Sequence, residues 1–187
     1  MRLNVPNAIT LGRIALIPLF VVMAHESGPW WRFFTALVFL AAALTDLLDG
    51  YLARRMNEVT ALGKLLDPVA DKLLMLSGLI MLVALSLAPA WIVIVILGRE
   101  MAVTGLRAIA ASDGIVMPAD EWGKWKTVSQ VTAIIMLILS WRWWIFDVRE
   151  IGTWVLWASM VLALISGARY GVVYLRGMER GAGPDRT

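Results

Sequence analysis

Apolar residues dominate long stretches of this chain, and short polar or charged segments separate one stretch from the next. A helix needs about 18 apolar residues or more to cross a membrane. Two stretches, 73–98 and 151–168, carry no charged residue over such a length. Pro89 interrupts the first of them, and because proline and the residue before it resist continuing a helix, we divide that stretch into two helices.

The whole pattern predicts an all-α membrane protein with six transmembrane helices in a single domain, residues 1–187. The predicted helices cover 7–24, 31–54, 66–85, 90–111, 124–144 and 151–174. Six crossings place both termini on one side of the membrane. Of the seventeen Lys and Arg residues, only Arg32, Arg142 and Arg149 fall on the opposite side, which leaves fourteen with the termini. The positive-inside rule then predicts that both termini face the cytoplasm.

The composition agrees with a membrane protein. Hydrophobic residues make up 60% of the chain and the mean hydropathy is +0.75, which is more apolar surface than one soluble core of this length buries. The absence of cysteine excludes disulfides and thiolate metal sites. The net charge is only +3, and we expect no nucleic-acid partner. The basic start and the apolar segment 14–24 also resemble a signal peptide, an alternative to the first of six helices.

The second to fifth predicted helices share one feature, an apolar outer half and a charged cytoplasmic half. Charged side chains are costly in hydrocarbon, so such halves are tolerable where they surround water. The sequence therefore predicts a polar cavity at the cytoplasmic side, where a lipid would meet a soluble substrate.

Four aspartates stand at helical spacing in the charged halves of the second and third helices. Positions i, i+3, i+4 and i+7 of one helical face are Asp46, Asp49, Gly50 and Ala53. Asp67 and Asp71 follow at i and i+4. Both pairs lie at the cytoplasmic ends of consecutive antiparallel helices, so the four carboxylates are able to converge. Four converging negative charges at a membrane require a cation. For any single aspartate, a helix cap or an interfacial salt bridge is the alternative.

Carboxylate oxygens without Cys or His ligands favour Mg²⁺ or Mn²⁺, and the number of acidic groups suits two ions. Such ions would grip a diphosphate and neutralise developing charge, leaving one carboxylate to accept a proton. Gly50, Ala53 and Gly63 are small where bulk would obstruct close helix approach or nucleotide entry.

The run Asp46-x-x-Asp49-Gly50-x-x-Ala53-Arg54, followed after eight residues by Gly63-x-x-x-Asp67-x-x-x-Asp71, resembles the signature of the CDP-alcohol phosphatidyltransferase family at every motif position. The resemblance implies a fold of six membrane helices, usually in a homodimer. It also implies that the first three aspartates bind metal and that Asp71 binds metal and acts as the general base. The residues it implies for the CDP moiety are Gly50, Ala53, Arg54 and Gly63.

A basic group follows in the fourth and fifth predicted helices. Arg99 and Arg107 are eight residues apart, near two helical turns, and Lys124 and Lys126 begin the next helix on the same side. These four residues are candidates to bind an anionic acceptor, since arginine and lysine both suit phosphate. The alternative is compensation of the aspartates or contact with lipid phosphates. Arg99 and Glu100 are neighbours, and we expect them to point in different directions rather than to pair.

These segments, with the opening 4–18, resemble the subgroup of the family that uses glycerol 3-phosphate as acceptor. The resemblance implies a bacterial inner-membrane enzyme that uses CDP-diacylglycerol as donor. Transferases for cardiolipin, phosphatidylserine or inositol phosphate are alternatives within the family. A small cation transporter and a structural membrane protein are alternatives outside it, but the carboxylates cluster at one end and do not form a path across the membrane. For Thr10 and Arg13 we leave two interpretations, binding of nucleotide or lipid and an N-capped amphipathic entry helix.

Overall fold

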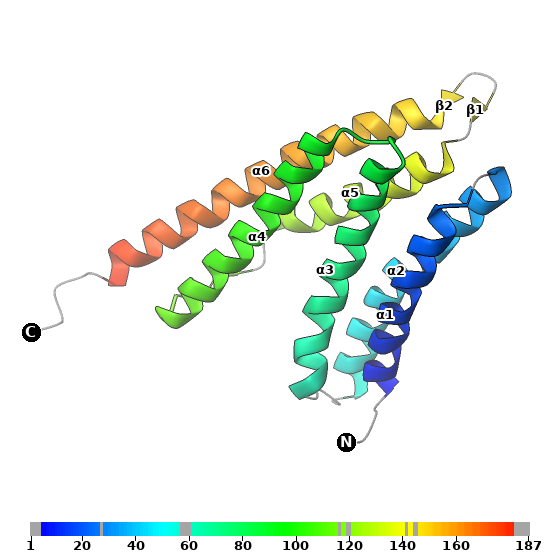
Figure 1. The fold of residues 1–187 in the computed structure, drawn as a ribbon. Coiled ribbons are helices and arrows are strands. Elements are labelled where there is room, and N and C mark those ends of the chain that lie inside the picture. Colours follow the sequence, from blue (N-terminus) through cyan, green and yellow to red (C-terminus); the bar gives the residue numbers. More distant parts are fainter. Residues whose placement is uncertain are drawn as a thin grey trace, which may run out of the picture. The chain divides into compact units, whose positions relative to one another are not determined.

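The computed structural model describes residues 5–26, 28–56, 61–115, 117–118, 121–140, 142–143 and 146–181. Its helices, shown in Figure 1, are α1 (Val5–Ala24), α2 (Pro29–Met56), α3 (Ala61–Ala84), α4 (Ala90–Ser112), α5 (Glu121–Leu139) and α6 (Val148–Gly181). Strands β1 (Arg142–Trp143) and β2 (Phe146–Asp147) form a short antiparallel pair between α5 and α6. The prediction of a six-helix, all-α chain is confirmed for these residues.

The helices form two compact units, which we describe one at a time. Unit 1 comprises Met1–Pro89 and Val131–Thr153, and unit 2 comprises Ala90–Gln130 and Trp154–Thr187. Helices α5 and α6 therefore contribute to both units. The single domain expected from the sequence stays a prediction.

In unit 1, α1 contacts both α2 and α3. The start of α1, the end of α2 and the start of α3 lie at one end of this unit, which we call the motif end (Figure 1). Phe20 packs against Phe39 with ring centroids 5.2 Å apart, and both side chains are fully buried. A Cβ atom at Gly78 on α3 would lie 2.7 Å from Phe39 Cε2 and 2.9 Å from Ile134 Cδ1. Close packing of α3 therefore requires glycine at this position.

Helix α3 ends in a Schellman motif. The Leu87 amide donates to the Leu82 carbonyl at 2.8 Å, and the Ser86 amide donates to the Val83 carbonyl at 3.0 Å. Ser86 has a φ of 56°, in the left-handed region that such a motif needs. Pro89 follows, so the helix does not resume before α4. The division that the sequence predicted at this proline is confirmed.

In unit 2, α4 ends in the same way, with glycine in the left-handed position. Gly114 has a φ of 73°, and the Ile115 amide donates to the Ala110 carbonyl at 2.8 Å. A Cβ atom at Gly177 on α6 would lie 2.7 Å from Ile115 Cγ2, so this glycine lets the segment after α4 pack against α6.

The end of α5 differs from the prediction. We expected a helix over 124–144, but α5 ends at Leu139 and Ser140 has a φ of 40°. The aromatic residues that follow continue the apolar pattern, yet aromatic side chains also favour strands, and β1 begins at Arg142. Asp147 then caps α6, because its Oδ1 accepts a hydrogen bond from the Arg149 amide at 2.9 Å.

Membrane-spanning character is clearest in α6. Within the described parts of the chain, the segment Val148–Met178 is long and apolar enough to cross a membrane. Ala8–Ala24 and Pro29–Thr45 are shorter apolar helical segments. In α3 and α5 the charged residues all lie in the first half of the helix, which matches the divided pattern seen in the sequence.

Candidate functional site

Helix α2 carries the first half of the aspartate motif. It runs without a break to Met56, so positions 46, 49, 50 and 53 stand on one continuous helix, as their spacing predicts. The side chains of Asp46, Asp49, Gly50, Ala53 and Arg54 lie outside the described residues. Positions 46 and 49 lie ten and seven residues before the end of α2, which is at the motif end of unit 1 (Figure 1).

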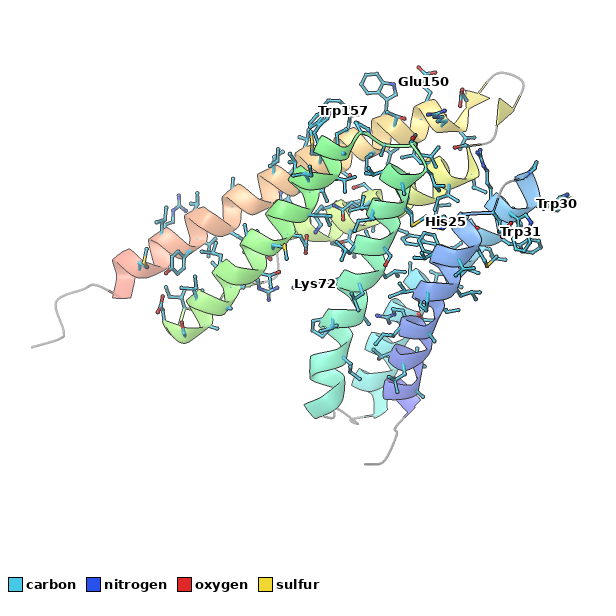
Figure 2. The ribbon with its side chains drawn as sticks, viewed as in Figure 1. His25, Trp30, Trp31, Lys72, Glu150 and Trp157 are labelled. Carbon is cyan, nitrogen blue, oxygen red and sulfur yellow. The ribbon has the colours of Figure 1, made fainter. Side chains whose placement is uncertain are left out.

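Helix α3 carries the second half of the motif. Gly63 is buried, two residues after the start of α3 at Ala61. Asp71 is partly buried, and Lys72 beside it is labelled in Figure 2. The side chain of Asp67 lies outside the described residues, but positions 67 and 71 are one helical turn apart on α3.

All four aspartates belong to unit 1. They lie on α2, which ends at the motif end, and on α3, which begins there (Figure 1). A donor set of carboxylate oxygens fits Mg²⁺ or Mn²⁺, and the two members of each pair stand about one helical turn apart on a continuous helix. Among the side chains that the structure describes, no group of three or more His, Asp or Glu residues could hold a metal ion. The side chains of Asp46, Asp49 and Asp67 are not among those described.

The sequence interpretation left Arg13 open, and the structure gives it a defined environment. Arg13 and Thr10 on α1 are both fully buried, three residues apart on the same helical face. Arg13 Nε donates a hydrogen bond to Thr45 Oγ1 at 3.3 Å. Thr45 directly precedes Asp46 on α2. An exposed amphipathic entry helix does not account for a buried guanidinium next to the motif.

Unit 2 contains the basic residues, and two of them form a network with Glu100. Arg99 donates from Nε to the Ala163 carbonyl at 2.8 Å and from Nη2 to Ser166 Oγ at 2.7 Å. Its Nη1 lies 3.2 Å from Glu100 Oε2, and Lys126 Nζ donates to the same oxygen. Arg99 thus joins α4 to α6, and Glu100 joins α4 to α5.

The pair between Arg99 and Glu100 corrects the sequence interpretation, which treated these neighbours as unpaired. Adjacent Cβ atoms on a helix do point in different directions, but both side chains are long. The Arg99 side chain is directed toward α6 by its hydrogen bonds to that helix. Gly167 on α6 leaves room for it, because a Cβ atom at this position would lie 3.1 Å from Arg99 Cγ. The remaining Nη1 then meets the Glu100 carboxylate.

Arg107 and Lys124 have a different environment. Both side chains are exposed, and the structure gives neither of them a partner among the described residues. They stay available for an anionic ligand, whereas the Lys126 side chain is only 7% exposed and is paired with Glu100.

A cavity of about 140 Å³ lies at the opposite end of unit 1 from the motif. Its lining includes His25, Glu26 and Arg32 near the turn between α1 and α2, and Leu87 after α3. His25 is labelled with Trp30 and Trp31 at this end in Figure 2. It is a different cavity from the polar one predicted beside the aspartates, which stays a prediction.

Comparison with known proteins decides the family. The model of the CDP-alcohol phosphatidyltransferase family matches residues 3–165, most of the chain. The chain belongs to this family. The matched region contains every aspartate of the motif, together with Arg13, Glu100 and the four candidate acceptor-binding residues Arg99, Arg107, Lys124 and Lys126.

Individual relatives cover nearly the whole chain. The CDP-diacylglycerol–glycerol-3-phosphate 3-phosphatidyltransferase of Bacillus subtilis (strain 168) is 42% identical over 179 residues, which are 89% of this chain and 93% of the relative. The protein of the same name from Rickettsia bellii is 38% identical over 168 residues, with the same two coverages. A CMP-forming cardiolipin synthase of Oryza sativa is 39% identical over 152 residues, but these are 74% of this chain and 46% of that protein.

Proposed function

We propose that this chain transfers the phosphatidyl group of CDP-diacylglycerol to glycerol 3-phosphate, giving phosphatidylglycerophosphate and CMP. The observation that carries the proposal is the agreement with relatives named for this reaction, at 38% and 42% identity over 89% of the chain. The continuous helices that bear the complete aspartate motif support the same reaction.

The proposed metal ligands are Asp46, Asp49, Asp67 and Asp71. Two bound ions, Mg²⁺ or Mn²⁺, would offset the negative charge of the diphosphate during transfer. Asp71 is the proposed general base and takes the proton of the acceptor hydroxyl. The acceptor oxygen then bonds to the phosphorus that carries diacylglycerol. The bond from that phosphorus to the oxygen of CMP breaks, and CMP leaves with the electron pair.

Binding of the two substrates falls to other residues. Gly50, Ala53, Arg54 and Gly63 are proposed to contact the CDP moiety, where small residues leave room for the nucleotide. The exposed Arg107 and Lys124 suit the phosphate of the acceptor, because they lack a competing partner among the described side chains. Lys126 and Arg99 would contribute positive charge while Glu100 and α6 fix their positions.

The proposed setting is the bacterial inner membrane. We expect six membrane-spanning helices, with both termini on the cytoplasmic side. The proposed polar cavity opens on the same side. We also expect the protein to form a homodimer. The apolar α6 and the charged first halves of α3 and α5 support this topology.

A cardiolipin synthase is the second candidate, because a relative of that name is 39% identical over 152 residues. The test is to incubate purified protein in detergent with CDP-diacylglycerol and one acceptor at a time, then measure CMP and the lipid product. We expect rapid CMP release with glycerol 3-phosphate, loss of it with a chelator, and recovery with Mg²⁺ or Mn²⁺. Preferred use of phosphatidylglycerol, serine, glycerol or inositol phosphate would refute the proposed acceptor.

A further inference from the structure

The buried face of α1 changes character along its length. Phe20 and Ala24 form its apolar part, and Phe20 packs against Phe39 of α2. Toward the motif end the same face presents Thr10 and Arg13, both with no exposed surface. A charged side chain that is fully buried in a membrane helix is costly, and such a residue is normally paired and functional.

The contact to α2 is directional. Thr45 Oγ1 donates its own hydrogen to the Ala42 carbonyl at 2.7 Å, which leaves the oxygen lone pairs for Arg13 Nε at 3.3 Å. A guanidinium has five N–H donors and keeps its charge in proteins, so Thr45 alone satisfies neither its charge nor its hydrogen-bonding capacity. A buried guanidinium is normally paired with a carboxylate, which makes the acidic residues near Arg13 its candidate partners.

Unit 1 offers few carboxylates for this role. From the sequence of unit 1, its acidic residues are Glu26, Asp46, Asp49, Glu58, Asp67, Asp71, Asp147 and Glu150. Glu26 lies beyond the far end of α1, more than about 15 Å from Arg13 along the helix axis. Asp147 and Glu150 also belong to that far end, because Arg149 between them donates to the Ser86 carbonyl after α3.

The remaining candidates are the four aspartates of the motif and Glu58, which follows α2 in the sequence. Asp46 follows Thr45 directly, and position 49 follows it by four residues, on the same face of α2. The residue that Arg13 contacts therefore shares its helical face with one metal-ligand position and adjoins another.

We propose that Arg13 is a positioning residue for the metal-binding aspartates of α2. Its guanidinium holds α1 against Thr45 of α2 and orients the neighbouring carboxylates for metal binding. The proposal rests on the proposed metal-dependent function, and it assigns Arg13 no contact with the substrates.

The test is Mn²⁺ binding to the purified protein in detergent, measured by electron paramagnetic resonance without substrate. We expect Arg13→Met to raise the Mn²⁺ concentration at half-saturation about ten-fold or more, because a charge-assisted contact and its alignment are lost. Arg13→Lys keeps the charge without the planar fork, and its half-saturation should be intermediate.

The matched control is Phe20→Leu. Phe20 lies on the same buried face of α1, so this variant loosens the contact with α2 without changing a charge. We expect a lower melting temperature and a half-saturation within about two-fold of the parent. If Phe20→Leu weakens Mn²⁺ binding as much as Arg13→Met does, Arg13 is merely structural and the proposal is wrong.

A second pair of variants covers the case in which Arg13→Met does not fold. Thr45→Val removes the oxygen that accepts from Arg13, and Thr45→Ser keeps it. Weaker Mn²⁺ binding in Thr45→Val but not in Thr45→Ser supports the proposal. Parent-like binding in both Thr45→Val and Arg13→Lys would overturn it. If the parent itself binds no Mn²⁺, the proposed metal-dependent function fails, and the role of Arg13 fails with it.

Discussion

Glu100 on α4 accepts a hydrogen bond from the ammonium group of Lys126 on α5, twenty-six residues further along the chain. Arg99 lies 3.2 Å from the same carboxylate oxygen. The two cations are thus held by protein groups, whereas the exposed Arg107 and Lys124 have no partner among the described residues. The four basic residues proposed for the acceptor should therefore respond differently to substitution.

Replacement of Arg107 should affect the acceptor alone. We expect Arg107→Ala to raise the KM for glycerol 3-phosphate about ten- to a hundred-fold, the cost of one charge-assisted contact, with the KM for CDP-diacylglycerol unchanged. The melting temperature should stay the same, because the side chain is exposed. Steady-state kinetics with each substrate varied in turn measures the two KM values. Arg176→Ala removes another exposed arginine of unit 2 as the control, and a change confined to the donor KM would contradict the assignment.

Replacement of Lys126 should affect both binding and stability. Lys126→Met is expected to raise the acceptor KM and to lower stability by about 1 to 3 kcal/mol, because it removes one of the two buried cations that pair with the Glu100 carboxylate. The double variant Glu100→Gln with Lys126→Met should regain part of the stability but not the acceptor KM. Thermal unfolding in detergent and kinetics separate the two effects. A double variant that loses the full sum of both single effects would show that the pair is not coupled.

Asp71→Asn should abolish turnover, because an amide does not take the proton of the acceptor hydroxyl. The amide oxygen remains a neutral ligand, so CDP-diacylglycerol should still bind. Asp46→Asn should instead weaken metal binding, seen as a higher metal concentration at half-maximal rate. Near-normal turnover of Asp71→Asn at saturating metal would remove Asp71 from the role of base.

The periodicity of apolar residues was sufficient to predict the six helices, since helix length and the break at Pro89 are local properties of the chain. The end of α5 was missed because an aromatic run is compatible with both helix and strand. The spacing of the aspartates likewise predicted that each pair stands on a continuous helix, and α2 and α3 run without a break through these positions.

Side-chain pairing was harder to predict. The bond from Lys126 to Glu100 joins residues on two helices, and no local spacing encodes it. For Arg13 a signal did exist, because Thr10, Arg13 and Phe20 have the spacing of one helical face. That pattern indicates burial of a charge, but it does not identify Thr45 as the acceptor.

Close helix packing in unit 1 gives a stability prediction. Gly78→Ala should destabilise the protein by about 1 to 3 kcal/mol, because the new methyl group would lie 2.7 Å from the fully buried ring of Phe39. The control is Gly12→Ala on α1, where a Cβ atom meets nothing within 4 Å and helix propensity improves. Melting temperatures in one detergent should fall for the first variant and stay level or rise for the second. Equal stability of both variants would contradict the packing described between α2 and α3.

The proposed topology places residue 57, directly after α2, and residue 25, directly after α1, on opposite faces of the membrane. The sequence contains no cysteine, so a single thiol introduced at either position reports without background. A thiol at Asn57 should react with an impermeant maleimide only from the cytoplasmic face. One at His25, an exposed residue beside Trp30 and Trp31, should react only from outside (Figure 2). Inverted and right-side-out vesicles provide the two faces, and detergent-solubilised protein provides the full-labelling control. Because α2 connects these two positions directly, labelling of both from one face would mean that α2 does not cross the membrane, and the six-span topology would then be wrong.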